Sequence, residues 1–167
     1  MSILSPDATH APILVSACLL GVPCRYDGQS CPVPALIAWA SSRWVIPFCP
    51  EVEGGLPTPR LPSEIEGART GLDGADVLAR RTRVLRSDGA DVTAHFIVGA
   101  QAAAGLAHDL GIRLAVLKSR SPSCGVGAIY DGRFQGTLVK GDGVTTSLLR
   151  RLGLCVLSEL DLPQEEG

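Results

Sequence analysis

Four short, mainly apolar runs are spread along the chain, at residues 13–17, 44–48, 114–117 and 154–157. A continuous apolar run of this length predicts a strand that is buried on both faces of a sheet. Pro47 lacks a backbone N–H and therefore places the second run near the end of a strand. The hydrophobic pattern thus predicts four buried strands.

Stretches with helical periodicity separate these runs. Apolar residues recur at helical spacing over residues 92–110, and we expect Asp91 to cap this long helix and Gly111 to end it. Shorter helices are predicted at residues 34–42 and 144–152. Alternating strands and helices predict an α/β fold of the Rossmann-like kind, with a mostly parallel open sheet and helices on both faces.

The remaining segments are rich in turn-forming residues. Residues 50–69 are expected to form an irregular, functional loop, because three prolines interrupt any helix there. Residues 128–140 predict a β-hairpin, and residues 84–85 a small edge strand. The expected organisation is a disordered leader at 1–12, a single α/β catalytic domain at 13–160 and a frayed tail at 161–167.

The composition argues against several classes of protein. The 167 residues include 15 basic and 17 acidic side chains, for a net charge of −2. No large nucleic acid is expected as a partner, and no anionic membrane, because both favour a basic excess. No run approaches the roughly 18 apolar residues of a membrane span, and the start of the chain lacks the basic residues of a secretory signal. We therefore expect a cytoplasmic protein whose six cysteines stay reduced.

Three of the cysteines come after predicted strands. Cys18 follows the first strand, Cys49 follows the second, and Cys124 lies in the loop after the third. Parallel strands end at one edge of the sheet, where α/β folds bind ligands, so we expect these thiols to meet there. The other three are interpreted as a spare thiol or fourth ligand (Cys24), a packing or surface residue (Cys31) and a small core residue (Cys155).

Three convergent thiols suit an inorganic centre with an open coordination position. The chain has no CxxC pair, so the usual zinc-ribbon and ferredoxin spacings do not fit. An iron–sulfur cube held by three cysteines leaves one iron free as a Lewis acid for a soft atom such as sulfur. Zinc at the same thiols is a weaker alternative.

Polar residues near these cysteines are candidates for catalysis. Glu51 is placed to orient or deprotonate a water. Ser121 and Ser123 are candidate hydrogen-bond donors, with turn formation as the competing interpretation. Arg60 and Glu64 are interpreted as an ion pair that shapes the proline-rich loop, or else as substrate contacts.

Six segments carry a resemblance to a known family: 15–21 (VSACLLG), 25–28 (RYDG), 48–52 (FCPEV), 54–60 (GGLPTPR), 118–125 (KSRSPSCG) and 129–132 (IYDG). Together they resemble the thiouracil desulfidases, a small bacterial family formerly labelled only as a domain of unknown function. The resemblance spans residues 13–159, and the order of the segments makes it specific.

The resemblance implies a [4Fe-4S] cluster with one iron not ligated by the protein, held by Cys18, Cys49 and Cys124. It also implies a non-redox desulfuration of thiolated uracil, as 2-thiouracil or thiouridine monophosphate, to the oxo form with release of sulfide. Glu51 corresponds to the family's catalytic carboxylate, and the assignment of Ser121 or Ser123 is weaker. Two alternatives stay open: a non-catalytic iron–sulfur or thiol redox protein, and a nucleotide-binding module.

Overall fold

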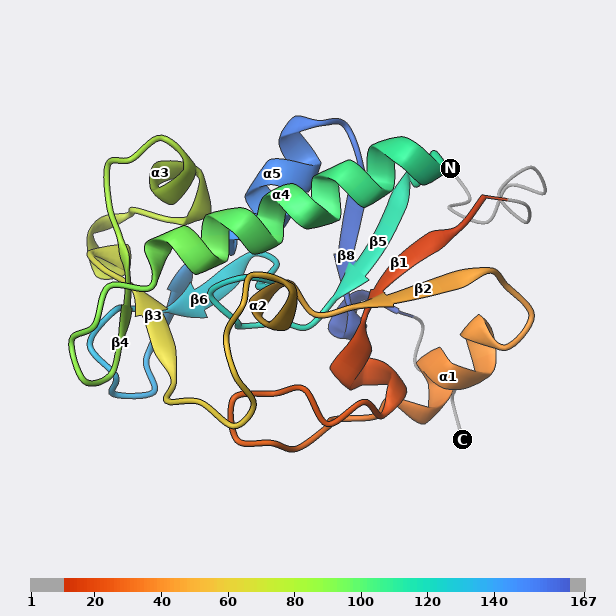
Figure 1. Cartoon of the computed structure of the whole chain (residues 1–167), viewed down its shortest axis with the longest axis horizontal. Coiled ribbons are helices and arrows are strands. Elements are labelled where there is room, and N and C mark those ends of the chain that lie inside the picture. Colours follow the sequence, from red (N-terminus) through yellow and green to blue (C-terminus); the bar gives the residue numbers. More distant parts are fainter. Residues whose placement is uncertain (1–10, 163–167) are drawn as a thin grey trace.

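A four-stranded parallel sheet lies at the centre of the protein, in a computed structural model that describes residues 11–162. Its strands are β1 (Ile13–Ser16), β2 (Val45–Phe48), β5 (Leu114–Leu117) and β8 (Cys155–Ser158), in the order β2-β1-β5-β8 (Figure 1). Every neighbouring pair is parallel. Each apolar run of the sequence therefore forms a strand, and Pro47 is tolerated because β2 lies at the edge of the sheet.

Helices cover both faces of this sheet. They are α1 (Pro34–Ala40), α4 (Thr93–Leu110) and α5 (Val144–Arg151). Successive side chains of a strand point to opposite faces. Leu14 and Ala115 accordingly pack with α4 and α5, whereas Val15 and Val116 pack with α1 on the other face. The predicted α/β class, with helices on both faces of a parallel sheet, is confirmed.

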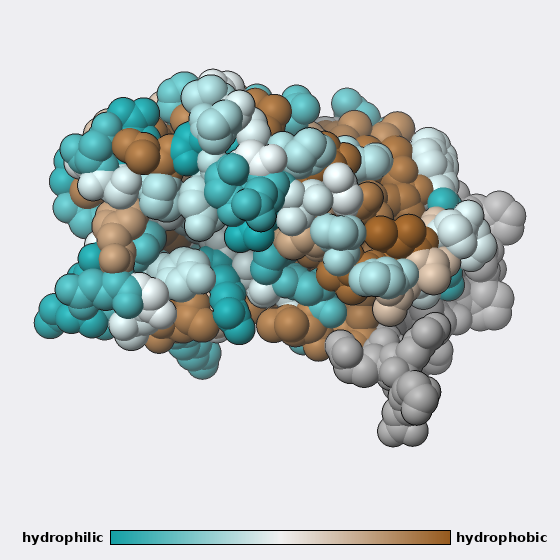
Figure 2. Space-filling view, turned by 90° about the horizontal axis from the view of Figure 1, so that it is seen from below, coloured by the Kyte–Doolittle hydropathy of each residue, from teal (hydrophilic) through white to brown (hydrophobic). Residues whose placement is uncertain are grey.

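Two small antiparallel sheets pack beside the amino-terminal half of α4. They pair β3 (Ser63–Ile65) with β4 (Val84–Arg86), and β6 (Ala128–Tyr130) with β7 (Leu138–Lys140). A short helix, α3 (Gly74–Leu78), lies in the same region and contacts α5. Their apolar core joins Ile65, Val84 and Ile129 to Phe96 and Ala100 of α4. Figure 2 shows a mostly hydrophilic surface over this region, whereas hydrophobic residues gather around the parallel sheet.

The segment 50–69 is more ordered than the sequence predicted. It begins with a one-turn helix, α2 (Pro50–Glu53), and includes β3. A proline in the first turn of a helix costs no hydrogen bond, so Pro50 can start α2. The three later prolines all lie between α2 and β3, where the chain is irregular as expected. The predicted hairpin and the edge strand at 84–85 are confirmed as β6–β7 and β4.

Two details differ from the sequence prediction at the ends of elements. Helix α4 begins at Thr93 and its N-cap is Val92, so the prediction that Asp91 is the capping residue is wrong; Asp91 lies one residue earlier, where its carboxylate accepts a hydrogen bond from the Thr93 N–H at 2.9 Å. Gly111 ends the helix as predicted, with a φ of 67°. Cys155 is exposed on the edge strand β8, so its interpretation as a core residue is wrong.

The predicted leader and tail lie mostly outside the described residues, and the single-domain boundary at 13–160 stays a prediction. No helix among residues 11–162 is long and apolar enough to cross a membrane.

Candidate functional site

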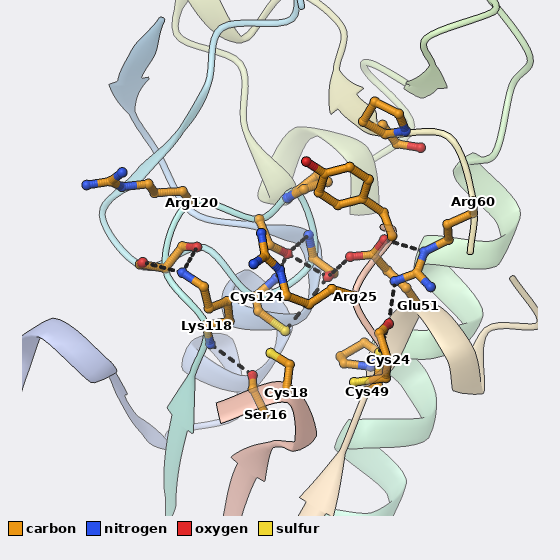
Figure 3. Close-up of a pocket in the computed structure, with 18 of the residues that line it drawn as sticks. Ser16, Cys18, Cys24, Arg25, Cys49, Glu51, Arg60, Lys118, Arg120 and Cys124 are labelled. Carbon is orange, nitrogen blue, oxygen red and sulfur yellow. Dashed lines mark hydrogen bonds and ion pairs between the residues drawn. The ribbon is translucent and has the colours of Figure 1, made fainter. Parts of the chain in front are cut away.

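A cavity of about 610 Å³ opens where the parallel strands end. Its walls contain five cysteines, listed here in chain order: Cys18, Cys24, Cys31, Cys49 and Cys124. All of them are free thiols. Figure 3 shows the side chains of Cys18, Cys24, Cys49 and Cys124 around the same space, together with Glu51 and Arg60. The structure thus brings the three cysteines of the sequence prediction to one cavity.

Each of the three cysteines is placed by the end of a strand. Cys18 lies in a 3-10 turn, Ala17–Leu20, that directly follows β1. Cys49 is the single residue between β2 and α2. Cys124 lies in the loop after β5, in a turn that closes when the Gly125 N–H donates to the Ser121 carbonyl oxygen at 2.8 Å. The convergence therefore follows from the parallel arrangement of the strands, as the sequence predicted.

Burial and mutual hydrogen bonds raise the pKa of three of the cavity thiols, those of Cys24, Cys49 and Cys124. A hydrogen bond with Cys18 raises the pKa of the Cys24 thiol, and burial adds to this rise. A hydrogen bond with Cys24, followed by burial, raises the pKa of Cys49 far above its ordinary value. Burial raises the pKa of Cys124 to about 12. A metal centre bound between such thiols would deprotonate them on coordination.

The spacing of the thiols indicates what kind of centre fits. Among the residues that the structure describes, no three His, Cys, Asp or Glu side chains lie close enough together to hold one metal ion. A polynuclear iron–sulfur cluster presents several iron atoms, each to a different thiolate, and so accepts ligands that are further apart. Three thiols from separate strand ends around one cavity are a donor set that such a cluster can use, since thiolates are its usual ligands.

The predicted catalytic side chains form one hydrogen-bonded chain. Ser123 donates its hydroxyl proton to Glu51 Oε2 at 2.8 Å. Ser121 Oγ lies 2.8 Å from Ser123 Oγ, and it accepts hydrogen bonds from the backbone N–H groups of Ser123 and Cys124. Because the only hydroxyl proton of Ser123 is given to Glu51, Ser121 must be the donor to Ser123. The chain of donors therefore runs from Ser121 through Ser123 to the carboxylate.

Arg60 holds the other oxygen of Glu51. Its Nε lies 3.2 Å from Glu51 Oε1, and the arginine side chain is only 6% exposed. Its Nη2 donates to the Cys24 carbonyl oxygen at 3.0 Å, and its Nη1 donates to the Pro57 carbonyl and the Thr58 hydroxyl. The predicted pairing of Arg60 with Glu64 is therefore wrong. Arg60 instead joins the carboxylate of α2 to the loop that carries Cys24.

Glycines fix the position of α2 and thereby of Glu51. Helix α2 lies directly against α4, where a Cβ added at Gly54 would come 2.0 Å from the His95 carbonyl oxygen. A Cβ added at Gly99 would equally come 2.0 Å from the Pro50 carbonyl oxygen. Only glycine permits this close approach of the two backbones. The carboxylate is thus carried by a short helix that is anchored to the longest helix of the protein.

The loop after β5 is tied down on its other side. Lys118 Nζ lies 2.9 Å from Glu159 Oε1, and the same carboxylate accepts the N–H and the hydroxyl proton of Ser119. The Lys118 N–H donates to Ser16 Oγ at 2.9 Å, which joins this loop to β1. Sequence reasoning missed Ser16, Glu159 and the role of Arg60, because each acts across long sequence distances.

These features define an α/β protein with a cysteine-lined cavity, in which a buried arginine and two serines hold a carboxylate. The profile of the family described as 2-thiouracil desulfurase matches residues 13–161, and the chain belongs to this family.

Two related proteins are similar to this chain over most of its length. The chain is 39% identical over 150 residues to the protein YbbK of Bacillus subtilis (strain 168), covering 90% of this chain and 97% of that protein. It is 49% identical to the solved structure of the [4Fe-4S]-dependent thiouracil desulfidase TudS, with a TM-score of 0.79 and coverage of 92% and 93% of the two chains. The family resemblance seen in the sequence is confirmed.

Proposed function

We propose that the protein hydrolyses the carbon–sulfur bond of a thiolated uracil and releases sulfide. The observation that carries this proposal is the placement of three strand-end thiols and a held carboxylate, Glu51, around one cavity. Membership of the 2-thiouracil desulfurase family and the similarity to TudS support it. The balanced reaction adds one water to the thiocarbonyl group and yields the carbonyl compound and hydrogen sulfide.

The proposed cofactor is a [4Fe-4S] cluster with one iron left open, and its ligands are Cys18, Cys49 and Cys124. When bound, it supplies a Lewis-acidic iron that draws electron density from the thiocarbonyl group. The protein's own contribution is to deliver three thiolates from three different strand ends. Cys24, whose thiol also lines the cavity, has no ligand role in this proposal, because three thiolates already leave the fourth iron open.

Glu51 is the proposed general base. Arg60 holds one oxygen of the Glu51 carboxylate and Ser123 holds the other. The orientation of the carboxylate toward an attacking water is therefore fixed. A general base that is fixed in this way contributes roughly 10²–10⁴-fold to rate. Ser121 and Ser123 act by holding the carboxylate in place, through the hydrogen bond from Ser123 to Glu51 and the contact of Ser121 with Ser123.

Anaerobic purification, followed by assay of iron, acid-labile sulfide and sulfide release from 2-thiouracil, tests the proposal. We expect iron and sulfide in the purified protein, and stoichiometric sulfide and uracil without any electron donor. Glu51→Gln should keep the iron and lose at least 10²-fold in turnover. Glu53→Gln is the matched control, since Glu53 lies exposed on the same turn of helix. Protein that reduces and reoxidises but releases no sulfide would instead favour a redox carrier.

The reducing cytoplasm is the proposed location. All six cysteines are unpaired in the structure, which is the state that a reducing compartment maintains.

A further inference from the structure

Glu64 is a buried acid that the proposed mechanism does not use. It lies on β3, is 8% exposed, and forms part of the wall of the thiol-lined cavity. No lysine, arginine or histidine among residues 11–162 forms an ion pair with it. Buried carboxylates are rare without a positive partner, because removing the charge from water is costly. The position of Glu64 therefore calls for a partner that the protein alone does not supply.

The two oxygens of Glu64 have different surroundings. Oε1 accepts both protein hydrogen bonds, from the backbone N–H groups of Gly132 at 3.0 Å and Phe134 at 3.2 Å. Within the described part of the chain, Oε2 accepts none, and it is not among the side-chain atoms that are fully enclosed without a partner. One oxygen therefore holds the 131–134 turn, and the other has no hydrogen-bond donor among the described residues, in a side chain that lines the cavity.

The surroundings of this acceptor suit a flat ring with an N–H group. Tyr130 and Phe134 also line the cavity, and an aromatic side chain offers an apolar face to a planar heterocycle. The backbone N–H of Phe134 donates to Glu64 Oε1, so the two residues adjoin in the cavity wall. A uracil ring carries an N–H at N3, between C2 and C4, so this N–H is adjacent to the sulfur-bearing carbon in both 2-thiouracil and 4-thiouracil.

We propose that Glu64 selects the pyrimidine by accepting a hydrogen bond from its N3–H, so that thiouracils bind and 2-thiocytosine is rejected. In 2-thiocytosine the ring nitrogen N3 carries a lone pair in place of the proton, which places two acceptors against each other. A site built around a hydrogen bond discriminates strongly against an analogue that cannot form it. This inference rests on the proposed function, because it places the thiolated pyrimidine in the same cavity.

Glu64→Gln is the decisive variant. The backbone N–H groups of Gly132 and Phe134 require an oxygen, so the glutamine oxygen takes the place of Oε1 and its NH₂ group replaces Oε2. The turn is retained, but the group without a protein partner changes from acceptor to donor. Glu66→Gln is the matched control, because Glu66 lies close by in sequence but is paired with Arg83 at the surface.

Binding of 2-thiouracil and 2-thiocytosine to the cluster-loaded protein is measured by calorimetry, beside the KM and kcat for sulfide release. We expect Glu64→Gln to weaken 2-thiouracil binding about tenfold or more, the size expected of one hydrogen bond to a charged group. The same variant should bind 2-thiocytosine more tightly than the wild type does. A residue that only holds the turn would not reverse the preference between two ligands of the same shape.

The outcomes separate this inference from the proposed function. An active wild type, with unchanged 2-thiouracil affinity in a folded Glu64→Gln variant, overturns the role of Glu64 alone. An inactive wild type that still binds 2-thiouracil through Glu64 overturns the proposed reaction alone. A wild type that binds neither ligand overturns both. If Glu64→Gln does not fold, equal affinity of the wild type for the two ligands still refutes the selection.

Discussion

Replacing Ser123 by alanine removes one of the two groups that hold the proposed general base. Ser123 is 1% exposed, and its hydroxyl donates to Glu51 Oε2 at 2.8 Å. The variant leaves that oxygen without a protein donor and leaves the Ser121 hydroxyl without its acceptor. Arg60 still holds Oε1, so the carboxylate stays in the cavity but gains freedom to rotate.

The size of the effect follows from the bond that is lost. A hydrogen bond to a charged group contributes about 1.5–3 kcal/mol. If that energy is used to orient Glu51 in the transition state, kcat/KM for sulfide release falls about 10- to 100-fold, at 1.4 kcal/mol per factor of ten. The iron content should not change. The Ser123 hydroxyl contacts only one proposed ligand, Cys124, and this contact is long, with 3.7 Å between Ser123 Oγ and Cys124 Sγ.

Steady-state sulfide release and iron analysis of the same preparation measure both quantities. Ser147→Ala is the control, because Ser147 lies on α5, away from the cavity, and its hydroxyl makes no hydrogen bond within residues 11–162. A folded Ser123→Ala protein with full iron and a kcat/KM within about twofold of the wild type would refute the orientation of Glu51 by serine.

Three further predictions concern other parts of the site. Arg60→Lys keeps the charge but cannot reproduce the fork of hydrogen bonds, so kcat should fall about tenfold with iron retained, as activity and iron assays would show. Cys18→Ser should abolish iron binding, whereas Cys155→Ser should leave the iron content unchanged; iron in the first variant would remove Cys18 from the ligand set. Burial alone would raise the pKa of Glu159, but hydrogen bonds from Lys118 and Ser119 lower it below the ordinary value. The stability that this carboxylate contributes is therefore present above the unfolded pKa of about 4.3 and is lost as the pH falls. Glu159→Gln should accordingly lower the free energy of unfolding by about 1–3 kcal/mol at pH 7 and by less at pH 3, as measured by urea denaturation.

The convergence of the thiols could be predicted because it depends on local and general features only. Apolar runs specify strands, alternation with helices makes the strands parallel, and parallel strands end at one edge. Cys18 and Cys49 lie within two residues of strand ends, so small errors in the strand boundaries did not matter. Cys155 was misjudged for a related reason: the sequence places it in a strand but does not show that β8 is an edge strand.

The partner of Glu51 could not be predicted in this way, and the loop from 54 to 63 shows why. Arg60 and Glu64 are four residues apart, a spacing that brings side chains together only on a helix. Here the chain is extended: the Arg60 N–H donates to the Tyr26 carbonyl oxygen at 2.7 Å, and Glu64 already belongs to β3. The two side chains therefore serve different parts of the cavity, since Arg60 reaches Glu51 on α2 and Glu64 holds the turn at Gly132.

The separation of these two charges leaves Glu51 with a cation, whereas Glu64 has none among residues 11–162. A carboxylate held by a guanidinium is fixed in orientation, as the proposed general base requires, whereas a buried carboxylate with no cation has an oxygen left for a ligand. The division of roles between the two acids thus follows from a loop conformation that depends on contacts with distant segments.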